Sequence, residues 1–196
     1  MKKLIIFFYI LVQIIVITSY ADYVNISSCQ TINSTLLAGT DEVRINESFS
    51  HSGSCFNVVE SNVKIDCMHN TISGDGSGTF LYSGTNNNNV SFVNCNVNSF
   101  SLGIDFSLFN VYNDNLYFEN LTFSDNKAPM RFGAGLAVRT NINTISHVHV
   151  GQSHFINNIA LGGAALFVYG ASTSVVDSSF SHNKGIVKTN DANVNF

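Results

Sequence analysis

Residues 118–126 read Phe-Glu-Asn-Leu-Thr-Phe-Ser-Asp-Asn, and the pattern in this stretch decides the fold. An apolar residue is followed by a polar residue at offset +2, an apolar residue at +5 and usually Asn at +8. The same register occurs four times: Phe92-Asn94-Val97, Phe118-Asn120-Phe123-Asn126, Val150-Gln152-Phe155-Asn158 and Val175-Asp177-Phe180-Asn183. The first residues of these copies are spaced by 26, 32 and 25 positions. Such a period is typical of a solenoid, in which each repeat buries its apolar face against its neighbours.

The offsets indicate β-strands rather than helices, because apolar Phe and Val at 0 and +5 suit a pleated, buried surface. Each repeat also holds a second apolar run, such as residues 133–138 and 163–168. We therefore predict an all-β fold, a right-handed parallel β-helix (solenoid) of about five to six coils stacked roughly 4.8 Å apart. The coils are expected over residues 58–196, after an irregular N-terminal cap over residues 22–57, and the C-terminus shows no cap.

Position +2 is expected to point inward at a corner of each coil. This places four side chains in one internal column, the predicted ladder of Asn94, Asn120, Gln152 and Asp177. Stacked amides satisfy one another, because each donates to one neighbour and accepts from the other. The +5 residues Phe123, Phe155 and Phe180 are expected to form an internal aromatic stack.

The first coil matches this register more loosely. Ile65 is its anchor, Cys67 occupies +2, and the next apolar residue, Ile72, falls at +7. We expect two extra residues at that turn.

Several of these stretches resemble known repeats. Residues 63–74, Val-Lys-Ile-Asp-Cys-Met-His-Asn-Thr-Ile-Ser-Gly, followed by residues 89–95, resemble the opening coils of the pectin-lyase-like superfamily of right-handed parallel β-helices. The Phe-x-x-Asn stretches beginning at Phe123, Phe155 and Phe180, interleaved with Gly-Ala runs, resemble the repeats of polymorphic outer membrane proteins. The resemblance covers residues 58–196. It implies the fold but no activity, because this superfold includes lyases, hydrolases, adhesins and passive spacers.

The N-terminus has the pattern of a secretory signal. Lys2 and Lys3 precede an apolar run over residues 4–17, and Ser19 and Ala21 form a small-x-small cleavage site. The run is shorter than the roughly 20 apolar residues of a spanning helix. We predict a signal peptide over residues 1–21, a secreted or cell-surface protein and no membrane span after cleavage; the alternative is an uncleaved signal anchor.

The composition restricts the partners. Only 11% of residues are charged and the formal net charge is −4, against about 25% charged residues in ordinary domains. The sequence contains no basic cluster, so we expect neither nucleic acid nor anionic lipid as a partner.

Four cysteines allow three pairings in an oxidising compartment. We predict a bridge between Cys29 and Cys55, which would close the N-terminal region. Cys67 lies at a +2 position and Cys95 one residue beyond the next, so their side chains are expected to diverge. A second bridge and two buried free thiols remain the alternatives for this pair.

The resemblance to pectin-lyase-like enzymes directs attention to carboxylates. Asp66, Asp105, Glu119 and Asp177 lie in successive coils. Because their offsets differ, they are not expected to converge at the roughly 5–9.5 Å that glycoside hydrolysis requires. Arg131 and Arg139 flank a Gly-Ala-Gly-Leu run and are read either as a base or sugar-binding fork or as solvated side chains.

Two further motifs receive structural interpretations. His147 and His149 share an outer strand face and His154 follows, yet no acid or Cys lies in the same coil, so we expect surface histidines. The stretch 74–78, Gly-Asp-Gly-Ser-Gly, lacks the Lys of a P-loop and is read as a flexible turn. No catalytic residue, metal ligand or cofactor is predicted.

Five Asn-x-Ser/Thr sequons would be glycan acceptors in a eukaryotic secretory route. Those retained are Asn25, Asn33, Asn46 and Asn89. Asn120 is excluded because the predicted ladder places it inward.

The sequence supports several function hypotheses. The first is a secreted or cell-surface structural or adhesive module that contacts glycans or proteins. The alternative is a polysaccharide-acting enzyme or a truncated relative, and a third is a receptor that binds through loops 83–89 or 127–133.

Phe196 begins a coil that does not finish, so we expect a fragment of a longer β-helix or end-to-end self-association.

Overall fold

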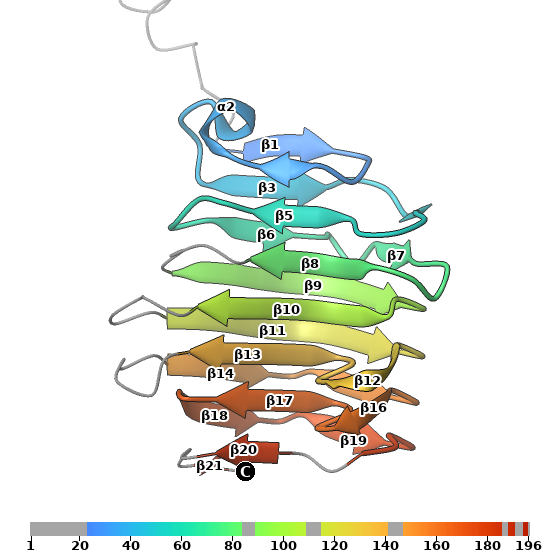
Figure 1. Ribbon diagram of the computed structural model, residues 1–196. Coiled ribbons are helices and arrows are strands. Elements are labelled where there is room, and N and C mark those ends of the chain that lie inside the picture. The colour runs from blue at the N-terminus through green and yellow to red at the C-terminus, as the bar shows by residue number, and fades with distance from the viewer. Residues whose placement is uncertain are drawn as a thin grey trace, which may run out of the picture.

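A computed structural model describes residues 23–83, 89–108, 115–140, 147–185, 188–190 and 194–195. Within them the chain forms a parallel β-solenoid of about five turns. As the chain descends in Figure 1, the near sheet runs leftward and the far sheet rightward, which is a right-handed path. The predicted all-β parallel solenoid is confirmed.

Three sheets run along the solenoid, and all of their strand pairs are parallel. The 12-stranded long sheet contains β1 (Tyr23–Ile26), β3 (Glu42–Ile45), β4 (Phe49–Ser50), β6 (Lys64–Asp66), β7 (Thr71–Ser73), β9 (Val90–Asn98), β11 (Asn115–Ser124), β14 (His147–Gly151), β15 (His154–Ile156), β18 (Ser172–Val176), β19 (Ser179–Ser181) and β21 (Val194–Asn195). The seven-stranded second sheet contains β2 (Thr31–Ile32), β5 (Phe56–Val58), β8 (Thr79–Ser83), β10 (Leu102–Leu108), β13 (Leu136–Thr140), β17 (Leu166–Tyr169) and β20 (Lys188–Asn190). The third sheet pairs β12 (Lys127–Phe132) with β16 (Ile159–Gly162).

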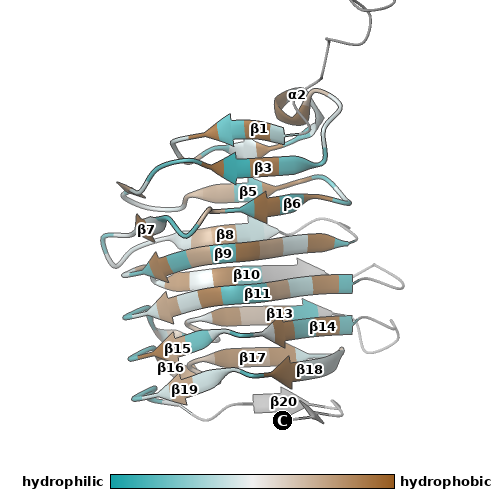
Figure 2. Ribbon diagram, turned by 180° about the vertical axis from the view of Figure 1, so that it is seen from behind, coloured by the Kyte–Doolittle hydropathy of each residue, from teal (hydrophilic) through white to brown (hydrophobic). Residues whose placement is uncertain are grey.

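The repeat register read from the sequence is the register of the long sheet. Phe92 pairs with Phe118, Phe118 with Val150, and Val150 with Val175. Figure 2 shows the resulting alternation of hydrophilic and hydrophobic residues along β9 and β11. The insertion expected in the first coil is also present, because Asp66 pairs with Val93 while Thr71 pairs with Asn96.

The core is filled by the inward residues of the two large sheets. Phe123 and Phe155 stack with ring centroids 5.2 Å apart, and Phe155 and Phe180 follow at 5.0 Å. Phe123 and Phe155 are fully buried. The predicted aromatic stack is therefore confirmed.

The predicted inward ladder is wrong, although its register is right. Asn94, Asn120, Gln152 and Asp177 all have left-handed backbone conformations with φ between 46° and 55°, and all but the half-buried Asn94 are exposed. A residue in that conformation bends the chain. The alternation of inward and outward side chains along the strand is reset at the bend, so the residue at +3 points inward. Asn120 Nδ2 donates to Asn94 Oδ1 at 2.8 Å, and Asn94 Nδ2 donates to Asp66 Oδ1 at 3.0 Å. This short column lies at the outer corner.

The internal asparagine ladder lies at +8 instead. Asn126 Nδ2 donates to Asn158 Oδ1 at 3.0 Å, and Asn158 Nδ2 donates to Asn183 Oδ1 at 2.9 Å. Asn126 and Asn158 are fully buried. The two amides also donate to the backbone carbonyls of Val97 and Phe123. These bonds tie four successive coils together, from that of Val97 to that of Asn183.

Strand stacking begins earlier than the sequence predicts. Strands β1 and β3 pair in parallel, as do β2 and β5, within the region expected to be an irregular cap. Buried Ile26, Ile32 and Val43 form these strands without any Phe-x-x-Asn stretch, so the repeat was not visible there. The one-turn helix α2 (Ser34–Leu37), capped by Asn33, lies over the first coil (Figure 1).

Two predictions concern residues outside the described ranges. These are the signal peptide over residues 1–21 and the unfinished coil at Phe196. Among the residues that the structure does describe, none of the helices has the length and apolarity needed to cross a membrane.

Candidate functional site: a groove along the second sheet

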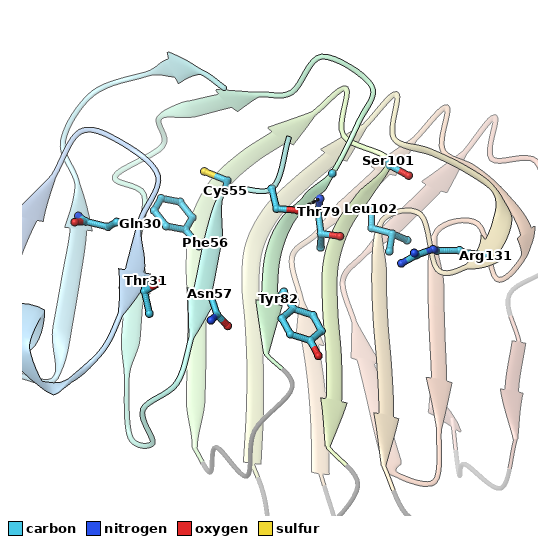
Figure 3. A pocket seen from close by; sticks show the side chains of 12 residues that line it. Gln30, Thr31, Cys55, Phe56, Asn57, Thr79, Tyr82, Ser101, Leu102 and Arg131 are labelled. Carbon is cyan, nitrogen blue, oxygen red and sulfur yellow. Dashed lines mark hydrogen bonds between the residues drawn. The ribbon is translucent and has the colours of Figure 1, made fainter. Parts of the chain in front are cut away.

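A groove of about 640 Å³ runs over the outer face of the second sheet (Figure 3). It crosses β2, β5, β8 and the start of β10, so its long direction follows the solenoid axis. Its lining residues are Gln30, Thr31, Ser54, Cys55, Phe56, Asn57, Gly78, Thr79, Tyr82, Ser101, Leu102 and Arg131. Most of them are neutral and polar.

A row of outward side chains forms the floor of this groove. Thr31 pairs with Asn57, Asn57 with Tyr82, and Tyr82 with Asp105. Strand alternation turns these residues outward, since their sequence neighbours face the core. Figure 3 shows Thr31, Asn57 and Tyr82 in one line across successive strands. Tyr82 is 43% exposed and presents an aromatic side chain with a hydroxyl to solvent.

A glycine-rich turn forms part of the groove wall. Gly78 has a φ of 64°, and a Cβ there would overlap the backbone of Gly53 in the neighbouring coil. In the same turn Asp75 accepts hydrogen bonds from Ser52 and Ser77. These bonds hold the pKa of Asp75 well below its usual range. The stretch 74–78 forms the connection between β7 and β8, and Asp75 binds it to Ser52 of the neighbouring coil.

Arg131 is the one charged residue in the lining. It extends from β12 at the far end of the groove, and it forms no ion pair with the described residues (Figure 3). Arg139 has a different environment: it forms an ion pair with Asp105 and lies over the ring of Phe167, with 5.6 Å between the guanidinium carbon and the ring centroid. The two arginines that the sequence grouped together are thus separated, and Arg131 remains available to a ligand.

Both disulfides are formed. Cys29 pairs with Cys55 beside the groove, as predicted, and Cys67 pairs with Cys95. The expected divergence of Cys67 and Cys95 is wrong. The corner bend at Asn94 turns Cys95 inward, toward the buried Cys67.

The four acids singled out from the sequence do not converge. Asp66 lies 3.4 Å from Lys64 Nζ on the long sheet, whereas Asp105 faces outward from the second sheet, and Asp177 occupies an exposed corner. Burial alone would raise the pKa of Asp66, but hydrogen bonds from Asn94 and the Met68 amide, together with the charge of Lys64, hold that pKa below its usual value.

Sequence reasoning missed a carboxylate–imidazole pair on the long sheet. Glu119 Oε2 lies 3.1 Å from His149 Nε2, although the two residues belong to neighbouring coils. Glu119 reaches His149 across Gly151, where any Cβ would overlap the carboxylate. The repeat register could have indicated this pair. It places Tyr117 opposite His149, and Glu119 lies two residues beyond Tyr117 on the same face of the strand. His149 is half-exposed, in keeping with the expected surface histidines, but it has a carboxylate partner in the neighbouring coil.

A second, smaller pocket of about 320 Å³ lies beside this pair and includes Tyr117, His147, His149 and Ser174 in its lining. His154 lies apart, with Nδ1 2.7 Å from the Ser179 hydroxyl. Within the described ranges no group of three or more His, Cys, Asp or Glu side chains could hold a metal ion.

The sequon asparagines fall into different environments. Asn25 and Asn46 are exposed, while Asn33 Oδ1 accepts from the Leu36 amide and caps α2. Asn89 Nδ2 donates to Asn62 Oδ1 at 2.9 Å. Asn120 is exposed, so the reason given for excluding it does not hold.

The two loops considered as receptor sites also differ. Residues 84–88 of the first loop lie outside the described ranges. The second loop, residues 127–133, is mostly strand β12, which contributes Arg131 to the groove.

No protein-family model, curated protein or solved structure matches this chain. The site must therefore be interpreted from its own geometry.

Proposed function

We propose that this chain is a secreted or cell-surface β-helix module that works by binding and holds a glycan in the groove along the second sheet. The observation that carries the proposal is the row Thr31–Asn57–Tyr82 beneath a long polar groove. Two disulfides support an oxidising, extracellular location.

The chemistry of the row suits a sugar chain. The amide of Asn57 and the hydroxyl of Thr31 can both donate and accept, which matches the hydroxyl groups of a glycan. The ring of Tyr82 supplies an apolar face with a polar tip, suited to packing against a pyranose ring. Because all three side chains stand on paired strands, little order has to be gained on binding. Arg131 would contact the end of the bound chain.

The alternative proposal, a polysaccharide-acting enzyme, has one specific observation in its favour. Glu119 and His149 form a carboxylate–imidazole pair beside the smaller pocket, an arrangement that can move a proton. If that alternative holds, incubating the protein with polysaccharides should release new reducing ends, and Glu119→Gln should abolish the release.

The proposal includes two further expectations from the sequence. The first is that the chain is related to pectin-lyase-like β-helices, with repeats like those of polymorphic outer membrane proteins. The second is that it is glycosylated in a eukaryotic host. Asn25 and Asn46 suit a glycan best because both are exposed and neither amide is used in a corner column.

Glycan-array binding followed by calorimetry with the best ligand tests the groove. Tyr82→Ala and Asn57→Ala should each weaken binding about tenfold, since a lost ring contact or hydrogen bond is worth roughly 1–1.5 kcal/mol. Tyr117→Ala is the matched control: Tyr117 is 49% exposed but lies on the long sheet, so binding should be unchanged. Equal losses for Tyr82→Ala and Tyr117→Ala, or no glycan bound at all, would refute the assignment.

A further inference from the structure

The third sheet carries a surface patch in which exposed apolar side chains accompany cations. Strands β12 and β16 lie together at one lateral edge of the stack (Figure 1). They present the two most exposed large hydrophobic side chains of the described residues, Met130 at 86% and Leu161 at 64%. We call Lys127, Met130, Leu161 and Lys184 the third-sheet patch.

Two lysines of this patch are aligned across three coils. Lys127 pairs with Ile159, and Ile159 forms a further parallel bridge with Lys184. Both lysines are exposed, and neither forms an ion pair within the described part of the chain. Their Cα atoms are about 10 Å apart, two strand spacings. Arg131 borders the patch and adds a third cation.

Met130 projects because β12 is irregular. The pairing of β12 with β16 shifts register between Ala128 and Phe132, and residues 129–131 are all exposed. Ala128 is buried against Leu102, which anchors the strand beneath the projection. The apolar side chains are therefore held outward by a firmly seated element.

We propose that the third-sheet patch docks the protein onto an anionic lipid surface. Met130 and Leu161 would enter the headgroup region, while Lys127 and Lys184 contact lipid phosphates and carboxylates. The expectation that excluded anionic lipid relied on the absence of a basic cluster in the sequence. Folding creates this cluster, because the lysines come from distant repeats.

The apolar side chains favour lipid over another polyanion. A sulfated or carboxylated polysaccharide would attract Lys127 and Lys184, yet it would gain nothing from burying Met130 and Leu161. A bilayer interface uses both kinds of side chain. The patch shares no residue with the groove, because Arg131 lines the groove and only borders the patch.

Flotation with vesicles of phosphatidylcholine, with and without phosphatidylserine, tests the proposal. The wild type should float only with phosphatidylserine vesicles. Lys127→Gln combined with Lys184→Gln should weaken binding about 25-fold, roughly fivefold for each charge near an anionic surface. Met130→Ser combined with Leu161→Ser should also weaken it several-fold.

Matched variants separate this patch from other surfaces. Met68→Ser with Val176→Ser removes two exposed apolar side chains outside the third sheet and should leave flotation unchanged. Tyr82→Ala should also float like the wild type, so a failed glycan assay leaves this test intact. Wild-type protein that floats equally, or not at all, with and without phosphatidylserine would overturn the proposal. So would a loss seen with the lysine variant alone, since the patch would then respond to charge from any polyanion.

Discussion

Asn158 illustrates how a single buried amide can join three coils. Its Nδ2 donates to Asn183 Oδ1 and to the Phe123 carbonyl, while its Oδ1 accepts from Asn126. Asn158, Asn126 and Phe123 are fully buried, and a buried polar group needs a partner. The amide at +2 in Asn120 makes a similar bond to Asn94, but at an exposed corner where water can replace it.

We therefore expect unequal effects from two Asn→Ala substitutions. Asn158→Ala should lower the free energy of unfolding by at least about 2 kcal/mol, because each buried group left without a partner costs about 1–3 kcal/mol. Asn120→Ala should cost less, about 1 kcal/mol, which comes from an exposed hydrogen bond and from placing Ala at a left-handed φ of 55°. Urea titrations measure both, and equal costs would contradict the assignment of the internal ladder to +8.

The lowered pKa of Asp66 makes the stability of the fold depend on pH. Its pKa is lower in the folded protein, so its contribution is fully present above the unfolded value of about 3.9 and is lost as pH falls through the lowered folded value. The pKa of Glu42 is also lowered: burial opposes this, but hydrogen bonds from Arg44 and Lys64 outweigh it. Stability should therefore fall as the medium is acidified below about pH 5.

Asp66→Asn is the informative variant for this effect. It keeps an oxygen that can accept from the Met68 amide and Asn94, but removes the ionisable group. Its stability should decline less steeply than that of the wild type between about pH 5 and 2, measured by chemical unfolding at each pH. Parallel curves would show that other groups dominate.

The strands and corners differ in how clearly they can be read from the sequence. Phe92, Phe118 and Val150 pair as the repeat predicts, because alternation along a strand follows directly from pleating. The corner at +2 could not be read in this way. An Asn there fits an inward ladder and a left-handed bend equally well, and the bend decides which way Cys95 points.

The aromatic stack of Phe123, Phe155 and Phe180 in the core leads to a second prediction about stability. Phe155 is fully buried between Phe123 and Phe180, so Phe155→Ala should cost about 3–5 kcal/mol. Leu161→Ala, at an exposed site of β16, should change the free energy of unfolding by less than about 0.5 kcal/mol. A Phe155→Ala cost below about 1 kcal/mol, measured in the same urea titrations, would contradict the packing.

At the scale of the whole molecule, the sequence predicted the architecture but not the surfaces. The period and the Phe-x-x-Asn stretches were sufficient for parallel coils over most of the chain. The groove, the Glu119–His149 pair and the third-sheet patch each combine residues from different coils. Their positions depend on corner lengths and on the register shift in β12, which no short motif encodes.

The disulfides give the stack an uneven response to mechanical force. Hydrogen bonds between coils point along the solenoid axis. A force applied along this axis therefore separates neighbouring coils one pair at a time. Cys29–Cys55 joins the coils of β1 and β3, and Cys67–Cys95 joins those of β6 and β9. Those two interfaces resist until a covalent bond breaks, whereas the coils after β9 have no such link among the described residues. Under tension the later coils should peel away first, leaving most of the groove on the part that holds.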